Sequence, residues 1–307
     1  MITNLNPESS LFIANVNRIE QSISDANSQV SSGLKINVAS DAPDQIDTLL
    51  QLRANLQQNT QVQSNLTLAT TDANAADSAL GSAIQLMDTA LSLASQGATA
   101  TTTAASRLTL AQQIQAIQQQ MVAYSQTTVQ GRFIFSGDQD DLAVYSWDSS
   151  AANPVVQNSN PLSTRVIQDP AGGSFPASMT AQQIFDDSDP TTGDPNQDNV
   201  FNALNTLYQA LQNNDTAGIN TAIPLLTSAS AQLNTSEAFY GNLEDRIQNA
   251  TAFANNYTVQ LQTQISQTED ADITSAATEL TQGNTQLQAA FEMQGQMPHS
   301  SLFNYLG

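Results

Sequence analysis

Long apolar heptads at both ends of the chain constrain its fold more than any other feature. Near the N-terminus, alternating steps of four and three link Phe12, Val16, Ile19, Ile23, Ala26 and Val30. Near the C-terminus, the same steps link Ile273, Ala277, Leu280, Asn284, Leu287 and Phe291. This spacing puts one stripe on one face of a helix, and such a helix is stable only when the stripe is buried against another helix. Both ends therefore predict halves of a coiled coil, formed with each other or with neighbouring copies.

The same spacing continues through most of the chain. Helices are expected over about residues 9–34, 43–94, 110–131, 199–211, 219–226 and 236–267, with a terminal helix that starts at 269–272 and ends at Met297-Pro298. The second of these holds its pattern for some fifty residues, a length of roughly 75 Å at about 1.5 Å per residue. The sequence thus predicts a few very long helices.

The segment between these helices has a different character. Arg132–Phe135 and Ala143–Trp147 are rich in β-branched and aromatic residues and flank a Ser-Gly-Asp turn, which predicts a hairpin. Val155-Val156 and Arg165–Ile167 are further strand candidates. The predicted fold class is mainly α, with long antiparallel coiled-coil helices from both chain ends and a β-containing inserted domain.

Composition excludes several classes of function. The formal net charge is −21, with one lysine and six arginines, so no cationic patch is available for nucleic acid or an anionic membrane. There is no cysteine, which excludes disulfides and thiolate metal sites. No apolar run approaches the length of a membrane span, and the first twelve residues lack the pattern of a Sec-type signal peptide.

Catalytic chemistry also finds little support in the sequence. The lone histidine, His299, cannot form a metal site or a triad. The aspartate-rich stretches 138–141 and 186–189 lack the spacing of a calcium-binding loop, so solvated acidic loops are favoured. We therefore expect no enzyme, no catalytic or metal residues and no cofactor.

Two motifs at opposite ends resemble those of the bacterial flagellin superfamily. They are the run Val30–Pro43 (VSSGLKINVASDAP) and the pair Glu269–Ile273 and Ala276–Leu280. Four features are more similar to the hook–filament junction proteins (hook-associated protein 3) than to filament flagellins: Asp41-Ala42-Pro43, Gln130–Gly137, Asn199–Leu204 and Ser301–Leu306. The opening Met1–Leu5 departs from the family pattern because it lacks an early arginine. Filament flagellin is the alternative within the superfamily.

The resemblance implies a structural subunit of the extracellular flagellum, exported by the flagellar type III system and folded into helical tubes on assembly. The implied divisions are an N-terminal assembly helix (1–42), a β-containing outward insert (132–198), a C-terminal assembly helix (268–307) and two parts of a rod domain (43–131 and 199–267). The implied partners are other copies, a hook-associated protein on the hook side, flagellin on the filament side, the export apparatus and an export chaperone. Nucleic acid and membrane are not among them.

The apolar stripes supply the candidate residues. We expect an assembly interface at Val16, Ile19, Ile23, Val30, Leu280, Leu287 and Phe291. Each such side chain stabilises the assembled state by about 1.5–3 kcal/mol when fully buried. Leu34, Lys35 and Ile36 are the expected hinge between the terminal helix and the rod. A secreted coiled-coil adhesin or needle-tip protein is a further alternative, which independence from flagellar export would reveal.

Overall fold

The fold is mainly α-helical with small antiparallel sheets in the middle of the chain, and this confirms the predicted fold class. The computed structural model describes residues 7–149, 153–161, 163–189 and 191–296. Its elements are α1 (Pro7–Ser32), α2 (Ile46–Ala98), α3 (Ala104–Ser125), β1 (Thr128–Val129), β2 (Arg132–Phe133), β3 (Tyr145–Trp147), β4 (Val155–Gln157), β5 (Val166–Gln168), β6 (Ser174–Pro176), α4 (Ala181–Phe185), α5 (Val200–Gln212), α6 (Thr216–Glu269) and α7 (Ile273–Gln296). Met1–Leu5, Met297-Pro298, His299 and Ser301–Leu306, all used above, lie outside the described residues.

The chain divides into two compact units. Unit 1 takes residues up to Gln58 and from Tyr257 onward, and unit 2 takes Asn59–Asn256. Helices α2 and α6 each contribute to both units. None of the helices in the described part of the chain is long and apolar enough to cross a bilayer.

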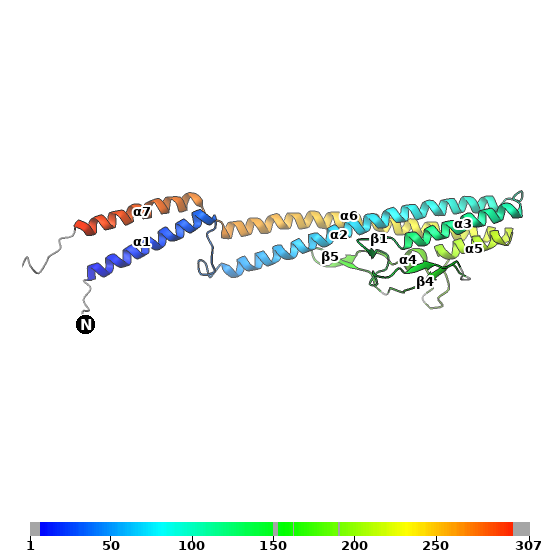
Figure 1. Cartoon of the computed structure of the whole chain (residues 1–307), viewed down its shortest axis with the longest axis horizontal. Coiled ribbons are helices and arrows are strands. Elements are labelled where there is room, and N and C mark those ends of the chain that lie inside the picture. Colours follow the sequence, from blue (N-terminus) through cyan, green and yellow to red (C-terminus); the bar gives the residue numbers. More distant parts are fainter. Residues whose placement is uncertain (1–6, 150–152, 162, 190, 297–307) are drawn as a thin grey trace, which may run out of the picture. The chain divides into compact units, whose positions relative to one another are not determined.

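Four helices build the core of unit 2. α3 and α5 lie alongside α2 and α6 (Figure 1). The apolar positions of the three-four pattern point inward from every helix, and many are completely buried, among them Leu66, Leu80, Met87, Ile114, Met121, Leu204, Leu226 and Leu233. Each of these side chains stabilises the folded state by about 1.5–3 kcal/mol when fully buried. Together they give unit 2 a hydrophobic core of its own.

A buried arginine closes one end of this helix bundle. Arg107, on the first turn of α3, is only 5% exposed. Its guanidinium donates to the backbone oxygens of Gly97 (2.8 Å) and Thr99 (3.1 Å) and to Oδ1 of Asn214 (2.7 Å). It thereby satisfies the carbonyl of Gly97, in the last turn of α2, which has no helical partner.

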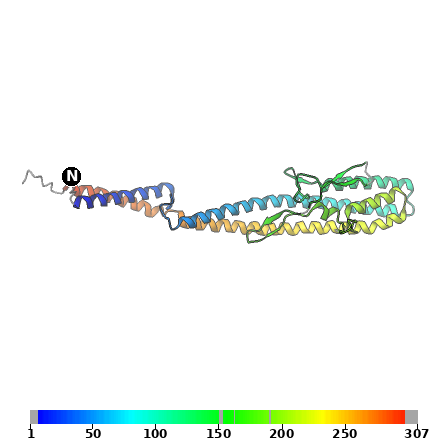
Figure 2. The same ribbon diagram turned by 90° about the horizontal axis from the view of Figure 1, so that it is seen from below.

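The β-containing segment packs into the same core as the helices. Phe135 and Phe185 are fully buried, with their ring centroids 6.0 Å apart, and Phe135 also lies 6.2 Å from the ring of Tyr240 on α6. Figure 2 shows the strands gathered along the helices of unit 2. On α2, Asp72 forms ion pairs with Arg165 (3.2 Å) and Arg132 (3.6 Å). Apolar and ionic contacts together fix this segment to the helices.

Two local predictions in this segment are wrong. The third helix ends at Ser125, not at Gly131, and the strand at Arg132–Phe133 pairs with β1 instead of with residues 143–147. The two loop residues of the β1–β2 hairpin, Gln130 and Gly131, both have positive φ (52° and 78°). This combination is typical of the tight turn that matches strand twist. β3 pairs instead with β4.

Further along, the strand candidates at 155–156 and 165–167 are confirmed as parts of β4 and β5, whereas β6 and α4 were not predicted. Helix α5 begins as expected, since the side chain of Asn199 caps it by accepting from the backbone nitrogen of Asn202 (2.9 Å). The two helices expected at 219–226 and 236–267 form one helix, α6, with Pro224 inside it. Proline costs about 3 kcal/mol in a helix interior, and the burial of neighbours such as Ile219 and Leu226 offsets that cost.

Candidate assembly surface

The helices from the two chain ends pair antiparallel within unit 1. At one end of the pair, Phe12 and Phe291 meet edge to face with ring centroids 6.4 Å apart. At the other end, Leu34 and Asp270 form an isolated antiparallel bridge. Of the two pairings left open by the sequence, the chain therefore adopts the one in which its own ends pack together.

A close approach of backbone marks the middle of this pair. A Cβ added at Gly283 would lie 2.6 Å from Cγ1 of Ile23, well inside van der Waals contact. Ala26 and Ala276 are both 1% exposed. Small side chains at 276, 283 and 290, seven residues apart, line the inner face of α7. This heptad of small residues on α7 was not predicted from the sequence, where the expected stripe ran through Ala277 and Asn284 instead.

The expected interface residues occupy different positions in the pair. Five are half-buried, namely Val16, Ile19, Ile23, Leu280 and Leu287. Val30 is 36% exposed, and Phe291, at the edge of the pair, is 54% exposed. The seam on α7 follows the small residues, so Ile273, Ala277 and Asn284 of the expected stripe lie outside it and are exposed. The apolar side chains of the terminal helices are thus only partly buried within one chain.

A second set of apolar side chains on these two helices faces solvent. It consists of Leu11 (65% exposed), Ile13 (49%), Ile273 (45%) and Met293 (65%), in addition to the exposed part of Phe291. Single exposed apolar residues are normal, but several on one pair of helices are typical of a surface that another molecule covers.

The expected hinge residues lie where α1 ends. Gly33 has φ +75° and follows the last residue of α1, the left-handed conformation that commonly ends a helix. Lys35 and Ile36 both donate from their backbone nitrogens to the carbonyl oxygen of Glu269 (2.6 and 3.4 Å). In return, Ala271 donates to the carbonyl of Gly33 (3.0 Å). The segment after α1 is therefore hydrogen-bonded to the segment between α6 and α7.

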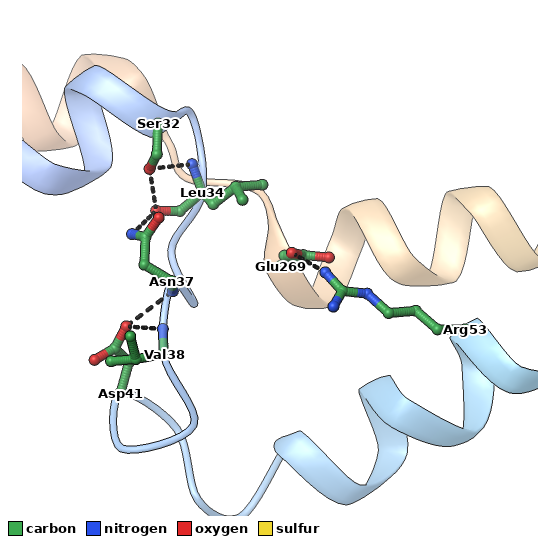
Figure 3. Close-up of polar contacts among 7 residues, drawn as sticks. All are labelled: Ser32, Leu34, Asn37, Val38, Asp41, Arg53 and Glu269. Atoms are coloured by element: carbon green, nitrogen blue, oxygen red, sulfur yellow. Dashed lines mark hydrogen bonds and ion pairs between the residues drawn. The ribbon is translucent and has the colours of Figure 1, made fainter.

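Side chains fix the same region further. Oδ2 of Asp41 accepts from the backbone nitrogens of Asn37 (2.8 Å) and Val38 (2.9 Å), as Figure 3 shows. Ile36 is 4% exposed and packs in a small cluster with Ala42 and Leu49. Of the three expected hinge residues, Ile36 is buried, Leu34 is half-buried and Lys35 is exposed.

An ion pair joins the two long helices beside this junction. Arg53 of α2 donates to the carboxylate of Glu269, whose side chain is only 6% exposed (Figure 3). Glu269 thus binds α2 through its side chain and the residues after α1 through its carbonyl. Sequence reasoning placed Glu269 at the start of the terminal helix, whereas it is the last residue of α6. Asp272 caps α7 by accepting from Thr274 (2.9 Å) and Ser275 (3.2 Å).

In the insert, an aspartate of one acidic loop connects a strand to a helix. Asp186 accepts from the hydroxyl of Tyr145 (2.8 Å) and from Nδ2 of Asn199 (2.7 Å), which ties β3 to the start of α5. Burial, and then the charge of Asp186, raise the pKa of Tyr145 far above its ordinary value. Within the described ranges, no group of three or more His, Cys, Asp or Glu side chains could hold a metal ion.

Comparison with known proteins identifies the two ends of the chain. Residues 3–140 match the model of the bacterial flagellin N-terminal helical region, and residues 223–306 match that of the bacterial flagellin C-terminal helical region. No curated protein matches the sequence closely enough to count as a relative.

Several solved structures share the fold at low sequence identity. A structure from Vibrio parahaemolyticus assigned as a flagellar hook-associated protein is 19% identical, with a TM-score of 0.63, 75% of this chain covered and 100% of that one. FlgL of Xanthomonas campestris is 15% identical (TM-score 0.58, 71% and 99% covered). Flagellar hook-associated protein 3 of Legionella pneumophila is 13% identical (TM-score 0.59, 73% and 98% covered).

Proposed function

This chain belongs to the bacterial flagellin family, and from that premise we propose that it is the hook-associated protein that joins hook to filament. The family places it among the structural proteins of the bacterial flagellum. The observation that carries the finer proposal is the extent of the fold likeness: the chain covers 98–100% of the length of the hook-associated structures from Vibrio and Legionella. Almost the whole of each of these structures is therefore matched by 73–75% of this chain.

The proposed mechanism is assembly through the terminal helices. The half-buried residues Val16, Ile19, Ile23, Leu280 and Leu287, with Val30 and Phe291, form the seam between copies as well as within one chain. Leu11, Ile13 and Met293 extend this seam, because 49–65% of each is exposed. Burying them against a neighbour adds about 25 cal/mol per Å² of apolar surface, which favours ordering of the terminal helices on assembly.

The junction after α1 is the proposed hinge, at Leu34, Lys35 and Ile36. Its backbone hydrogen bonds to residues 269–271 hold the end of α1 to the start of α7, so that the two helices move together on assembly. With residues 1–42 and 268–307 as assembly helices, residues 43–131 and 199–267 form the rod domain. Residues 132–198 form the outward insert.

Export and partners complete the proposal. The chain leaves the cell through the flagellar type III apparatus, with a chaperone before export, and occupies an extracellular position between another hook-associated protein and flagellin. It performs no catalysis and needs no cofactor.

Immunogold electron microscopy of intact flagellated cells tests this proposal. An antibody raised against the insert should label one point where hook meets filament, and cells lacking the chain should show no label there. Label along the whole filament would make the chain a filament flagellin instead. Secretion that persists without flagellar export would contradict both.

A further inference from the structure

Five of the seven cationic side chains of this chain form contacts within the molecule. The sequence has 28 acidic side chains against seven lysines and arginines, for a net charge of −21. Arg107 is buried against backbone oxygens of its own chain, and Arg53 is paired with Glu269. Neither guanidinium is left to compensate the acidic surface.

Three further arginines hold the β-containing segment to the helices. Arg132 and Arg165 both pair with Asp72. Arg132 also reaches Asp140 (3.4 Å), and Arg246 lies 4.2 Å above the ring centroid of Phe175 and 3.9 Å from Asp169. The carboxylate partners of the arginines named here are thus Asp72, Asp140, Asp169 and Glu269.

Much of the acidic charge that no arginine compensates lies in the insert. Between residues 132 and 198 the sequence has ten aspartates and two arginines, a net charge of −8 (2 − 10). Both arginines are directed at Asp72 on α2. Asp138, Asp141 and Asp194 are exposed, and no arginine pairs with them.

Such a surface repels itself within one molecule and repels a second copy. Like charges destabilise the compact state, and the repulsion reaches about 30 Å at 0.01 M ionic strength but only about 3 Å at 1 M. We infer that this protein is adapted to a cation-rich medium: cations in solution, acting as a screening atmosphere, stabilise unit 2 and allow acidic copies to approach one another. The second effect rests on the proposed function, whereas the first does not.

The test compares three forms of the full chain: wild type, the triple variant D138N/D141N/D194N and the charge-preserving control D138E/D141E/D194E. Thermal unfolding and static light scattering are measured from about 10 mM to about 1 M NaCl, where screening changes most. We expect the wild-type Tm to rise and net repulsion between molecules to fall as salt increases. In the neutralised variant, which lowers the net charge of residues 132–198 from −8 to −5, the salt-dependent gain in Tm should be smaller than in wild type, and the control should follow wild type.

The outcomes separate this inference from the proposed function. A Tm that is independent of salt, or equal salt dependence in the neutralised variant and wild type, would overturn it. A salt-dependent Tm without assembly at any salt concentration would support the first effect, stabilisation of unit 2, and contradict both the second effect and the assembly proposal. Assembly strongest at the lowest salt would overturn it and leave the assembly proposal standing.

Discussion

Units 1 and 2 are built from the same three-four apolar pattern, yet they bury it to very different extents. Among the described residues, 43 buried apolar side chains belong to unit 2 and six to unit 1. Of the fourteen large apolar residues that are exposed in the described part of the chain, nine lie in unit 1, although it is the smaller unit. One unit completes its core within the chain, and the other leaves apolar surface for something else to cover.

The contrast separates stability from assembly. In unit 2, four helices and the β-containing segment surround the apolar stripes, so a core mutation should lower the free energy of unfolding. In unit 1, α1 and α7 face each other across one thin seam of small residues, and isolated helices of this length are marginal in water. Mutations there should change association more than the stability of unit 2.

The largest expected effect comes from the core of unit 2. Phe135→Ala removes a fully buried ring between Phe185 and Tyr240 and should lower the free energy of unfolding by about 3–5 kcal/mol. Unfolding by denaturant measures this change in the free energy of unfolding. The matched control is Val166→Ala on β5, 67% exposed, which should change stability by less than about 0.5 kcal/mol. Equal effects would mean that the β-containing segment is not part of the core.

A somewhat smaller loss is expected at the end of the bundle. Arg107→Ala leaves the carbonyl of buried Gly97 without its arginine donor and removes the contact with Asn214, at about 1–3 kcal/mol. Arg107→Lys should recover part of this, because an ammonium supplies a charge but not the planar fork. Chemical denaturation distinguishes the three forms, and an unchanged midpoint for the alanine variant would contradict the capping role.

Alanine substitutions at two glycines of α7 should change the stability of the α1–α7 pair by about 1 kcal/mol, with opposite signs. Gly283→Ala forces a methyl group against Ile23 and should weaken the α1–α7 pair by about 1–2 kcal/mol. Gly295→Ala meets nothing within 4 Å and should strengthen the helix by about 0.5–1 kcal/mol. Hydrogen exchange of the α1 amides reads out both. Faster exchange in Gly295→Ala, or slower exchange in Gly283→Ala, would disprove this pairing.

The smallest effect concerns pH. Partial burial, then the charges of Asp77 and Asp245, raise the pKa of Glu244 in unit 2. A carboxyl with a raised folded pKa binds its proton more tightly when folded, so its penalty is present at neutral pH and disappears as pH falls through that pKa. Glu244→Gln should therefore raise Tm slightly at pH 7, and the gain should shrink in acid. A gain that grows as pH falls would have the wrong sign.

Periodicity predicted the helices and their mutual burial because a continuous three-four stripe has few other solutions. It also placed the start of α5, since Asn199 is a strong cap directly before the stripe. It failed where short-range turn chemistry or tertiary burial decides. The positive φ values at Gln130 and Gly131 redirect strand pairing, and buried neighbours keep α6 continuous through Pro224. At the candidate surface, Gly283 was missed because a residue without a side chain carries no hydrophobic signal.

The most direct test of this account changes exposed apolar residues of unit 1 without touching the side chains buried between α1 and α7. In the double variant Leu11→Asp/Met293→Asp, both replaced side chains are 65% exposed. The control Ser24→Asp/Gln282→Glu adds the same charge at exposed polar positions of the same helices. The account predicts that both variants keep the Tm of unit 2 but that only the first loses self-association in sedimentation at high salt. Self-association that survives in Leu11→Asp/Met293→Asp would contradict it.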